Sequence, residues 1–415
     1  MQTKVFHVVI VGAGMAGVSV ATRLRELGFA GAVTLVSQEE EAPYDRPPLS
    51  KQFLLDGDAD AIRLQPEALA AQALADIALI RGNPAVALDV RAREVRLGDG
   101  RGLRWDRLVL ATGARPRVLP ALARSPRVQT LRTLEDARAI RQTLTLGARL
   151  LIVGGGPIGL ELAAMGLRLD ARVTLVEAAD RLMTRSAPAL IAEHLRRHHV
   201  DSGVDIRLGR SVADAPDDGH AVLDDGARVA ADLIVVGIGV HANDELAVQA
   251  GLAADDGIFV DGFGRTTAPG VFAIGDVTRQ RNPATGRFER IETWSNAQGQ
   301  ARALAAHLTD PDNAVPYAET PWFWSDQGEL RLQAAGAITG DEQAIRGDPQ
   351  SGRFSLIQWR DGRIVGVAAV NAARDFHMLR RLVAAGSRLR PEVLTDPQAN
   401  LKSLIAAAAA PSTPA

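Results

Sequence analysis

The chain has 415 residues, of which 47% are apolar and 23% charged, so it can form a large core in two to four domains. Its 47 basic and 49 acidic residues nearly cancel, which gives no electrostatic reason to expect nucleic acid or a membrane as partner. It contains no cysteine, and this excludes disulfides, iron–sulfur clusters ligated by this chain, and a redox-active dithiol.

The N-terminal segment HVVIVGAGMAGVSVATRLRELG, from His7, predicts a buried parallel strand, a glycine turn and a helix. A second strand is predicted at 33–37, which completes a β-α-β unit. No n-region, h-region or cleavage site precedes the first strand, and no apolar run approaches the ~20 residues of a membrane span. We therefore expect a cytoplasmic protein.

The next part of the chain contains a proline-rich loop, YDRPPLSK, from Tyr44 to Lys51. A helical stretch is predicted near 66–75, followed by short strands and turns up to Trp105. The segment LVLATGARP (108–116) predicts a strand that ends in a Thr-Gly turn.

A copy of the first unit begins at Leu150 with LLIVGGGPIGLELAAMGLRLD, and its second strand is predicted at 173–177. Strands are also predicted at 231–240 and 270–279, the latter with a Gly-Asp turn. From about Pro321 strands alternate with turns, at 330–337, 354–359 and 364–370, and two helical stretches follow. The tail AAAAAPSTPA (406–415) is expected to be disordered.

Both β-α-β units carry the motif Gly-x-Gly-x-x-Gly. The motif glycines are Gly12, Gly14 and Gly17 in the first copy and Gly154, Gly156 and Gly159 in the second. In this motif the first glycine permits a tight turn, the second lets the backbone approach a pyrophosphate, and the third lets the helix pack closely. The phosphates then lie at the positive end of the helix. Two dinucleotide sites are therefore predicted.

An acidic residue about 20 positions after such a motif binds a ribose hydroxyl and repels a 2′-phosphate. Glu177 fulfils this in the second copy, and the nearest arginine, Arg181, comes only later. NADH is therefore favoured over NADPH, which stays an alternative. In the first copy Ser37 takes the matching place and Gln38 and Glu39 follow, so the ribose contact is Glu39 or the main chain.

Asp276, in the Gly-Asp turn, can hold a ribityl or pyrophosphate group, and by itself it could equally be an N-cap. With the N-terminal glycine motif and the internal Thr-Gly turn it forms the signature of an FAD domain interrupted by an NADH domain. We predict an α/β fold with two Rossmann-like dinucleotide-binding domains and a C-terminal α+β domain. The predicted boundaries are 1–115 and 244–319 for the FAD domain, 116–243 for the NADH domain, and 320–415 for the C-terminal domain.

Many motifs in one order resemble the oxygenase-coupled NADH-dependent ferredoxin reductases. They include GAGMAG, YDRPPLSK, VLATGARPR, LRTLEDA, VGGGPIGLELAA, AIGDVTRQRNP, RIETWSNAQGQA and PWFWSDQ. This family includes putidaredoxin reductase, rubredoxin reductase and the reductase components of aromatic-ring dioxygenases. The resemblance implies a glutathione reductase-type fold.

The resemblance also implies roles for individual residues. Lys51 would lie against the flavin and pair with Glu161 on its nicotinamide side, Arg132 would hold an FAD phosphate, and Trp322 would approach the flavin. Beyond the motif glycines, it places further FAD contacts at Ala16, Ser37, Gln38, Glu39, Arg46, Pro47, Ala85, Val86, Thr112, Gly113, Gly275, Asp276, Glu292, Thr293 and Trp294. It places further NADH contacts at Pro157, Ile158, Glu161, Gly237 and Gly239. No metal ligand is expected.

The implied reaction is transfer of hydride from NADH to FAD and of single electrons to a Rieske-type or plant-type ferredoxin. Without cysteine the electrons must leave the flavin directly. Trp322 is then either a relay for them or a packing residue. The expected acceptor is a ferredoxin that serves an aromatic-ring dioxygenase, and the alternatives are a ferredoxin that serves a cytochrome P450 or a rubredoxin. A signalling flavoprotein switched by NADH is a remote alternative. The protein is expected to be a monomer or weak homodimer.

Overall fold

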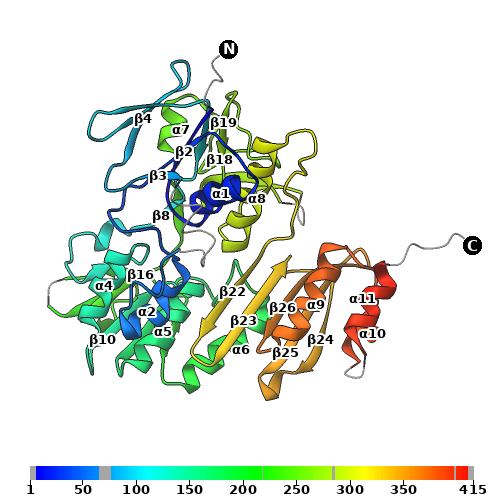
Figure 1. The fold of residues 1–415 in the computed structure, drawn as a ribbon. Coiled ribbons are helices and arrows are strands. Elements are labelled where there is room, and N and C mark those ends of the chain that lie inside the picture. The colour runs from blue at the N-terminus through cyan, green and yellow to red at the C-terminus, as the bar shows by residue number, and fades with distance from the viewer. Residues whose placement is uncertain (1–5, 65–75, 217, 283–285, 397–398, 410–415) are drawn as a thin grey trace, which may run out of the picture. The chain divides into compact units, whose positions relative to one another are not determined.

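The computed structural model describes residues 6–64, 76–216, 218–282, 286–396 and 399–409 (Figure 1). The chain divides into two compact units. The first unit comprises Met1–Arg46, Asp58–Arg115 and Val240–Pro321, and the second comprises Pro47–Gly57, Pro116–Gly239 and Trp322–Ala415. The helix predicted near 66–75 lies outside the described residues.

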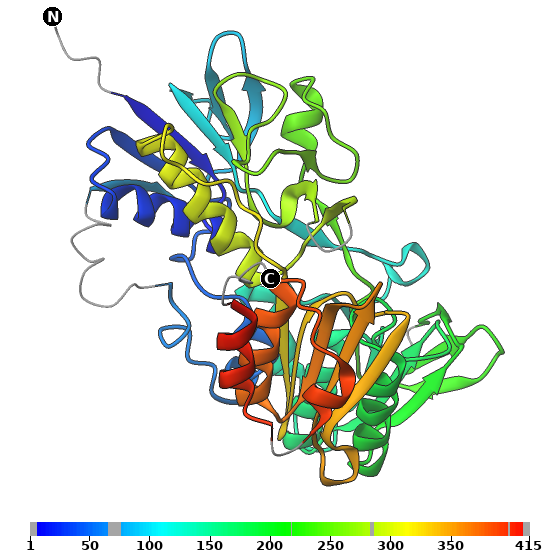
Figure 2. The same ribbon diagram turned by 90° about the vertical axis from the view of Figure 1, so that its right-hand side faces the viewer.

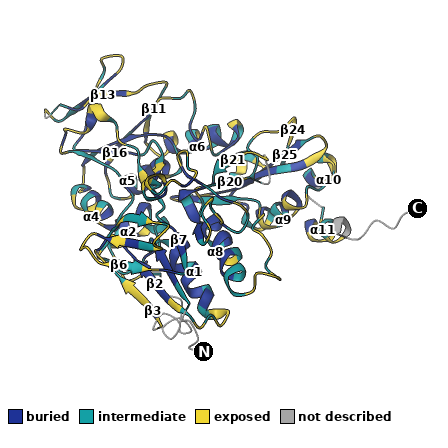
Figure 3. Cartoon of the chain, turned by 90° about the horizontal axis from the view of Figure 1, so that it is seen from above, coloured by how far each residue is buried: buried dark blue, intermediate teal, exposed yellow. Residues whose placement is uncertain are grey.

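The first unit is built on a parallel sheet of order β19-β7-β1-β2-β3. Its strands are β1 (His7–Val11), β2 (Ala32–Val36), β3 (Ile77–Ile80), β7 (Arg107–Leu110) and β19 (Val271–Ala273). Helices α1 (Met15–Glu26) and α8 (Trp294–Thr309) lie side by side against it (Figure 1). The edge strand β3 carries exposed residues (Figure 3). By contrast, β1 lies between β7 and β2 and is buried along almost its whole length.

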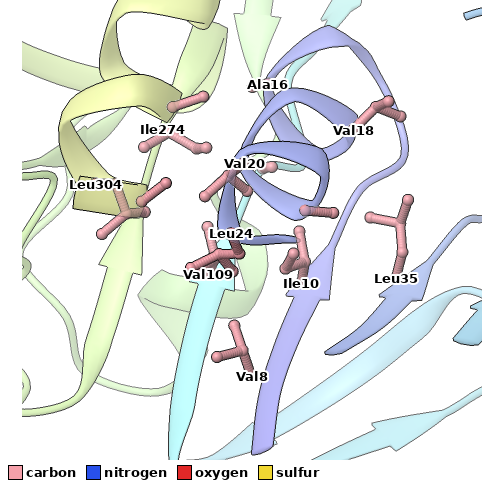
Figure 4. Close-up of a cluster of buried hydrophobic side chains, with 14 of the residues drawn as sticks. Val8, Ile10, Ala16, Val18, Val20, Leu24, Leu35, Val109, Ile274 and Leu304 are labelled. Carbon is pink, nitrogen blue, oxygen red and sulfur yellow. The ribbon is translucent and has the colours of Figure 1, made fainter. Parts of the chain in front are cut away.

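The core between this sheet and the two helices is mostly aliphatic (Figure 4). Ile10 of β1, Val109 of β7 and Leu304 of α8 point toward Val20 and Leu24 of α1. All five side chains are fully buried, and each contributes roughly 1.5–3 kcal/mol by burial. This packing fixes the start of α1 at the carboxyl end of β1, where the glycine turn lies.

The second unit repeats this sheet with the order β12-β11-β10-β16-β9. Its strands are β9 (Val128–Gln129), β10 (Arg149–Val153), β11 (Arg172–Glu177), β12 (Asp205–Leu208) and β16 (Leu233–Val236). Here β12, β11, β10 and β16 take the places of β3, β2, β1 and β7, but the strand at the remaining edge differs. β19 follows the rest of its sheet in the sequence, whereas β9 precedes its own. The internal repeat is therefore a repeat of sheet geometry with a changed connection at one edge.

Both units contain further strands and helices. In the first unit they are β4 (Ala85–Asp89), β5 (Glu94–Leu97), β6 (Gly102–Arg104), β8 (Ala114–Pro116), β17 (Val240–Ala242), α7 (Glu245–Gln249), β18 (Ile258–Phe259), η3 (Gly275–Val277), β20 (Thr278–Arg281) and β21 (Phe288–Arg290). In the second they are η1 (Pro47–Ser50), α2 (Gln52–Asp56), η2 (Pro120–Leu122), α4 (Leu134–Thr143), α5 (Pro157–Arg168), α6 (Ala189–Asp201), β13 (Val212–Asp214), β14 (His220–Leu223) and β15 (Arg228–Ala230).

The C-terminal segment forms an antiparallel sheet of order β22-β23-β26-β25-β24. Its elements are β22 (Trp322–Gln327), β23 (Leu330–Gly336), β24 (Glu342–Asp348), η4 (Pro349–Ser351), β25 (Arg353–Arg360), β26 (Arg363–Val370), α9 (Ala373–Ala384), α10 (Pro391–Thr395) and α11 (Leu401–Ala409). The three helices cover one face of this sheet (Figure 2).

The expectation of a disordered tail from 406 onward is wrong for 406–409. These alanines continue α11, because alanine has the highest helix propensity of the residues and Leu401 anchors the helix in the core. Residues 410–415 lie outside the described part. None of the helices that the structure describes has the length and apolar character that a bilayer crossing requires.

The two parallel sheets share one feature, at the start of β1 and of β10. Asp106, just before β7, accepts a hydrogen bond from the His7 amide at 3.0 Å. Asp232, just before β16, accepts from the Arg149 amide at 2.8 Å and also from the Arg149 guanidinium. Each aspartate thus accepts a hydrogen bond from the main-chain amide of the first residue of the neighbouring strand.

Asp232→Asn is expected to lower the melting temperature at pH 7 by a few degrees. Its hydrogen bonds with Arg149, opposed by partial burial, lower the pKa of Asp232 to about 2. Since the folded pKa lies below the unfolded value, the stabilisation is present above about pH 4 and is lost as the pH falls toward 2. Thermal unfolding of both proteins between pH 2 and 7 tests this. A difference that persists unchanged at pH 2 would contradict it.

Candidate functional site

The two glycine turns have nearly the same geometry. Gly12 has φ +113° and Gly154 has φ +112°, a conformation that residues with a Cβ rarely adopt. A Cβ at Gly12 would lie 2.1 Å from the Ala111 carbonyl oxygen, and one at Gly154 would lie 2.5 Å from that of Gly237. In both sheets the turn therefore crosses directly over the end of the neighbouring strand, which only glycine permits.

The other motif glycines divide into two kinds. A Cβ at Gly17 or Gly159 would lie about 2 Å from the carbonyl oxygen of the first motif glycine, so these positions set the approach of the helix. By contrast, apart from the adjoining residues of the chain, no described atom lies within 4 Å of a Cβ built on Gly14 or Gly156. These two residues are the N-caps of α1 and α5.

The space beside Gly14 and Gly156 suits a pyrophosphate in each copy. It adjoins the N-terminus of a 12-residue helix, whose first amides have no partner within the helix and whose dipole favours an anion. No acidic side chain occupies the first turn of either helix. The residues present therefore fit the two dinucleotides that the sequence predicts.

Glu39 is held by a hydrogen-bonded cluster and is not a solvated charge. Its carboxylate accepts from Arg46 at 2.7 Å and from the Tyr44 hydroxyl, and the Arg46 guanidinium lies over the Tyr44 ring. The Ser37 hydroxyl accepts from the Glu39 amide at 3.2 Å, which shapes the turn after β2. Burial lowers the pKa of Arg46, but the combined effect of Tyr44, Glu39 and Asp276 is larger and raises it. The pKa therefore lies above its ordinary value, and the guanidinium stays charged. A ribose contact by Glu39 stays a prediction.

The Thr-Gly turn after β7 is fastened to Asn243. The Thr112 hydroxyl donates to the Asn243 carbonyl at 2.6 Å, the Asn243 side-chain amide donates to the Thr112 carbonyl at 2.9 Å, and the Asn243 main-chain amide donates to the Gly113 carbonyl at 2.9 Å. Sequence reasoning did not identify Asn243, which ends the stretch VVGIGVHAN at 235–243.

The Gly-Asp turn is fixed by a buried amide network. Gln300 of α8 accepts from the Gly275 amide at 2.6 Å and donates to the Thr278 hydroxyl and to the Gln280 side chain. Asp276 follows Gly275 within η3. Gln300 was also missed by sequence reasoning, and the only signal for it is its place in the motif RIETWSNAQGQA.

The other residues predicted to contact FAD lie at several places. In the first unit, Ala16 is in the first turn of α1, Gln38 lies between Ser37 and Glu39, and Ala85 and Val86 begin β4. Thr293 caps α8, whose first residue Trp294 donates its indole N–H to Asp45 at 3.0 Å, and Glu292 pairs with Arg290. In the second unit are Pro47, Lys51, Arg132 and Trp322.

In the second copy, Glu177 is bonded to the glycine turn. One carboxylate oxygen accepts from the Gly155 amide at 2.7 Å and the other from the Ala179 amide at 2.8 Å. Arg181 donates to the carbonyls of its own loop, including that of Thr184 at 3.0 Å. An acidic group therefore lies at the turn, while the nearest arginine in sequence is engaged elsewhere. This arrangement favours a free ribose hydroxyl over a 2′-phosphate.

The remaining residues predicted to contact NADH lie on α5 and after β16. Pro157 and Ile158 begin α5, and the Ile158 side chain is exposed. Gly237 and Gly239 follow β16. A Cβ on Gly239 would lie 3.0 Å from the guanidinium of Arg185, a residue that sequence reasoning did not identify.

Lys51 and Glu161 form the ion pair that the family resemblance implies. The Lys51 ammonium lies 3.0 Å from the Glu161 carboxylate, and it also donates to the Pro47 carbonyl. The Ser50 hydroxyl donates to the same carboxylate oxygen as Lys51, at 2.5 Å. Glu161 is only 3% exposed, and this burial raises its pKa while Lys51, Ser50 and Ser325 lower it. The net direction is upward, because taking a carboxylate out of water is costly.

Sequence reasoning missed Ser50, Ser325, Gln327 and His199, which extend this pair into a buried polar chain. Trp322 lies on β22, where its ring contacts those of Trp324 and Phe376. Arg132 precedes the Thr133 N-cap of α4, and its amide donates to Asp136. Across the described ranges, no group of three or more His, Cys, Asp or Glu side chains could hold a metal ion.

The chain is similar to known reductases over nearly its whole length. It is 42% identical to the ferredoxin–NAD⁺ reductase component of the p-cumate 2,3-dioxygenase system of Pseudomonas putida, over 97% of this chain and 99% of that protein. It is 41% identical to the corresponding component of the anthranilate 1,2-dioxygenase system of Burkholderia cepacia, over 96% and 98%.

Among solved structures, the covalent putidaredoxin reductase–putidaredoxin complex gives a TM-score of 0.91 at 37% identity, covering 98% of this chain and 99% of that one. The predicted α/β fold with two dinucleotide-binding sheets is thereby confirmed. The model of the pyridine nucleotide-disulphide oxidoreductase family matches residues 6–301, and that of the reductase C-terminal family matches residues 322–405. The chain belongs to the pyridine nucleotide-disulphide oxidoreductase family, and it is an oxidoreductase that binds FAD and NAD(H).

Proposed function

We propose that this protein is the reductase component of an aromatic-ring-hydroxylating dioxygenase system, carrying electrons from NADH through FAD to a ferredoxin. The observation that carries the proposal is the pair of matching pyrophosphate turns at Gly14 and Gly156 in a chain without cysteine. Members of this family that reduce disulfides pass electrons to a thiol pair, which this chain lacks. Its electrons must therefore pass from the flavin to another protein.

Bound FAD would accept a hydride from NADH and release single electrons, and this chemistry belongs to the cofactor. In the first unit, Gly14, Thr112 and Asp276 would hold FAD through its phosphates and its adenosine and ribityl groups. In the second unit, Gly156 and Glu177 would hold NADH by its pyrophosphate and ribose. The buried Lys51–Glu161 pair would supply a positive charge beside the flavin ring, with the carboxylate preventing Lys51 from being an unpaired buried charge.

The second candidate is a reductase for a ferredoxin that serves a cytochrome P450, and the likeness to putidaredoxin reductase favours it. The likeness to two dioxygenase components favours the first candidate. The two differ in the acceptor. An NADH-dependent assay of the flavin-loaded protein, with a Rieske-type and a plant-type ferredoxin in parallel, distinguishes them. Reduction of the plant-type protein alone would overturn the dioxygenase assignment.

Trp322→Ala is expected to slow ferredoxin reduction several-fold while leaving flavin reduction by NADH nearly unchanged. Trp322 contacts Trp324, Phe376 and the guanidinium of Arg380, which lies 4.8 Å from its ring centre. Stopped-flow absorbance measures the two half-reactions separately. Trp324→Ala, on the same face of β22, is the matched control for lost packing. Equal slowing of both half-reactions by Trp322→Ala would assign this residue to packing.

A further inference from the structure

A buried chain of hydrogen bonds leads away from the Lys51–Glu161 pair inside the second unit. The Glu161 carboxylate oxygen that does not contact Lys51 accepts from the Ser325 hydroxyl at 2.7 Å. Ser325 in turn accepts from the side-chain amide of Gln327 at 3.1 Å. The Gln327 carbonyl oxygen lies 2.9 Å from His199 Nε2. The chain thus joins a histidine of α6 to the carboxylate on α5 through two residues of β22.

The chemistry of these groups fixes the direction of each hydrogen bond. An ionised carboxylate only accepts, so the Ser325 hydroxyl must donate to Glu161. Gln327 donates its N–H to that hydroxyl, and its carbonyl oxygen can then only accept from His199. His199 must therefore carry its proton on Nε2. Every donor points toward Glu161, and hydrogen bonds aligned in this way polarise and strengthen one another.

Because the groups of this hydrogen-bonded chain are buried, each of them depends on its partner within the chain. Ser325 and Gln327 are fully buried, and His199 is 1% exposed. Bulk water therefore does not reach any of them, and a buried carboxylate that loses a donor is costly. The charged group acting on Glu161 is Lys51. Burial lowers the pKa of His199, and its hydrogen bond with Gln327 opposes this. The titratable group His198, whose ring lies 5.7 Å away, also lowers the pKa of His199.

Strand β22 connects this chain to the tryptophans. Alternate residues of a strand point to opposite faces, so Ser325 and Gln327 share one face and Trp322 and Trp324 share the other. The first pair contacts Glu161 and His199, whereas Trp322 packs on Phe376 of α9. One six-residue strand therefore carries both the donors to the buried carboxylate and the aromatic residue proposed to act in electron transfer.

We propose that Ser325, Gln327 and His199 are positioning residues that keep the Glu161 carboxylate ionised and oriented toward Lys51. This inference deepens the proposed function, and it rests on that function only for the role of the Lys51–Glu161 pair beside the flavin. Through these hydrogen bonds, residues of the C-terminal sheet set the charge state of the Lys51–Glu161 pair, which belongs to the nucleotide-binding part of the second unit. Loss of any donor shifts Glu161 toward its protonated form and releases Lys51 from its partner.

The first test removes the donor nearest to the carboxylate. In the full-length protein loaded with FAD, Ser325→Ala is expected to raise the proton affinity of Glu161 about tenfold or more, as loss of a hydrogen bond to a charged group does. The C=O stretch of a protonated carboxyl, followed by infrared spectroscopy during a pH titration, reports this without turnover. Glu161→Gln assigns the band. Ser325→Thr, which keeps a hydroxyl, is expected to restore the wild-type titration.

Ser355→Ala is the matched control. Ser355 lies on β25 of the same sheet, is fully buried, and among the described residues its hydroxyl has no hydrogen-bond partner. It reproduces the loss of a buried serine hydroxyl without touching the chain. We expect it to leave the carboxyl titration unchanged. If Ser325→Ala titrates like Ser355→Ala and the wild type, Ser325 does not position Glu161 and the proposal is overturned.

The second test is made on the wild-type protein, and a variant serves only to assign the signals. Nitrogen-15 NMR of the wild-type protein, with His199→Gln for assignment, is expected to show His199 neutral and protonated on Nε2 at pH 7. A proton on Nδ1 would overturn the direction of the chain. Both measurements are independent of NADH oxidation. If the wild type does not reduce a ferredoxin, the proposed function fails while the hydrogen-bonded chain is still judged by its own results.

Discussion

Gly156→Ala is expected to weaken NADH binding at least about tenfold, or roughly 1.4 kcal/mol, while the protein keeps its fold and its FAD. The added methyl group would fill the space beside the N-terminus of α5 that a pyrophosphate requires. Its backbone has φ −82° and ψ −176°, which alanine adopts freely, so the change introduces no strain. Titration with NADH or NAD⁺, and the KM for NADH, measure the effect.

Gly14→Ala is the matched control, because it makes the same change at the N-cap of α1. It is expected to lower the FAD content of the purified protein and to leave NAD⁺ affinity intact. Gly159→Ala supplies the contrast, since its Cβ would lie 2.1 Å from the Gly154 carbonyl oxygen and must distort the turn. If Gly14→Ala weakened NAD⁺ binding and Gly156→Ala depleted FAD, the assignment of the two sites would be reversed.

Glu177→Arg is expected to change the preferred nicotinamide cofactor, with kcat/KM falling for NADH and rising for NADPH. The carboxylate lies at the turn, bonded to the amides of Gly155 and Ala179, where a ribose hydroxyl would be recognised. Reversing the charge there replaces repulsion of a 2′-phosphate by attraction, which corresponds to about tenfold or more in the ratio of the two constants.

Glu177→Gln separates charge from hydrogen bonding. Its side-chain oxygen can still accept one of the two amides, so the turn keeps part of its support while the negative charge is lost. We expect an intermediate NADPH-to-NADH ratio from steady-state kinetics with both cofactors. An unchanged ratio in both variants would remove Glu177 from cofactor selection, and a loss of folding in Glu177→Arg alone would assign it to holding the Gly155 amide.

The amino-acid sequence by itself determined the two dinucleotide turns and the elements on either side of them. This was possible because the requirements are local. Gly12 and Gly154 need a positive φ that only glycine adopts readily, and the apolar runs before them identify strands buried on both faces. The absence of cysteine is likewise visible in the sequence alone, and it excludes a disulfide route for the electrons.

The tertiary structure decided which polar side chains meet. Ser325 and Gln327 lie more than 150 positions from Glu161 along the chain, and no periodicity or spacing relates a serine on β22 to a glutamate on α5. Hydrophobic patterning specifies which face of an element is buried, but it does not specify the polar partner that each buried carboxylate finds. The partner is determined only when the sheet that carries β22 packs on α5 and α6. This packing places the Lys51–Glu161 ion pair, which was predicted from the sequence, at one end of a buried chain of hydrogen-bond donors.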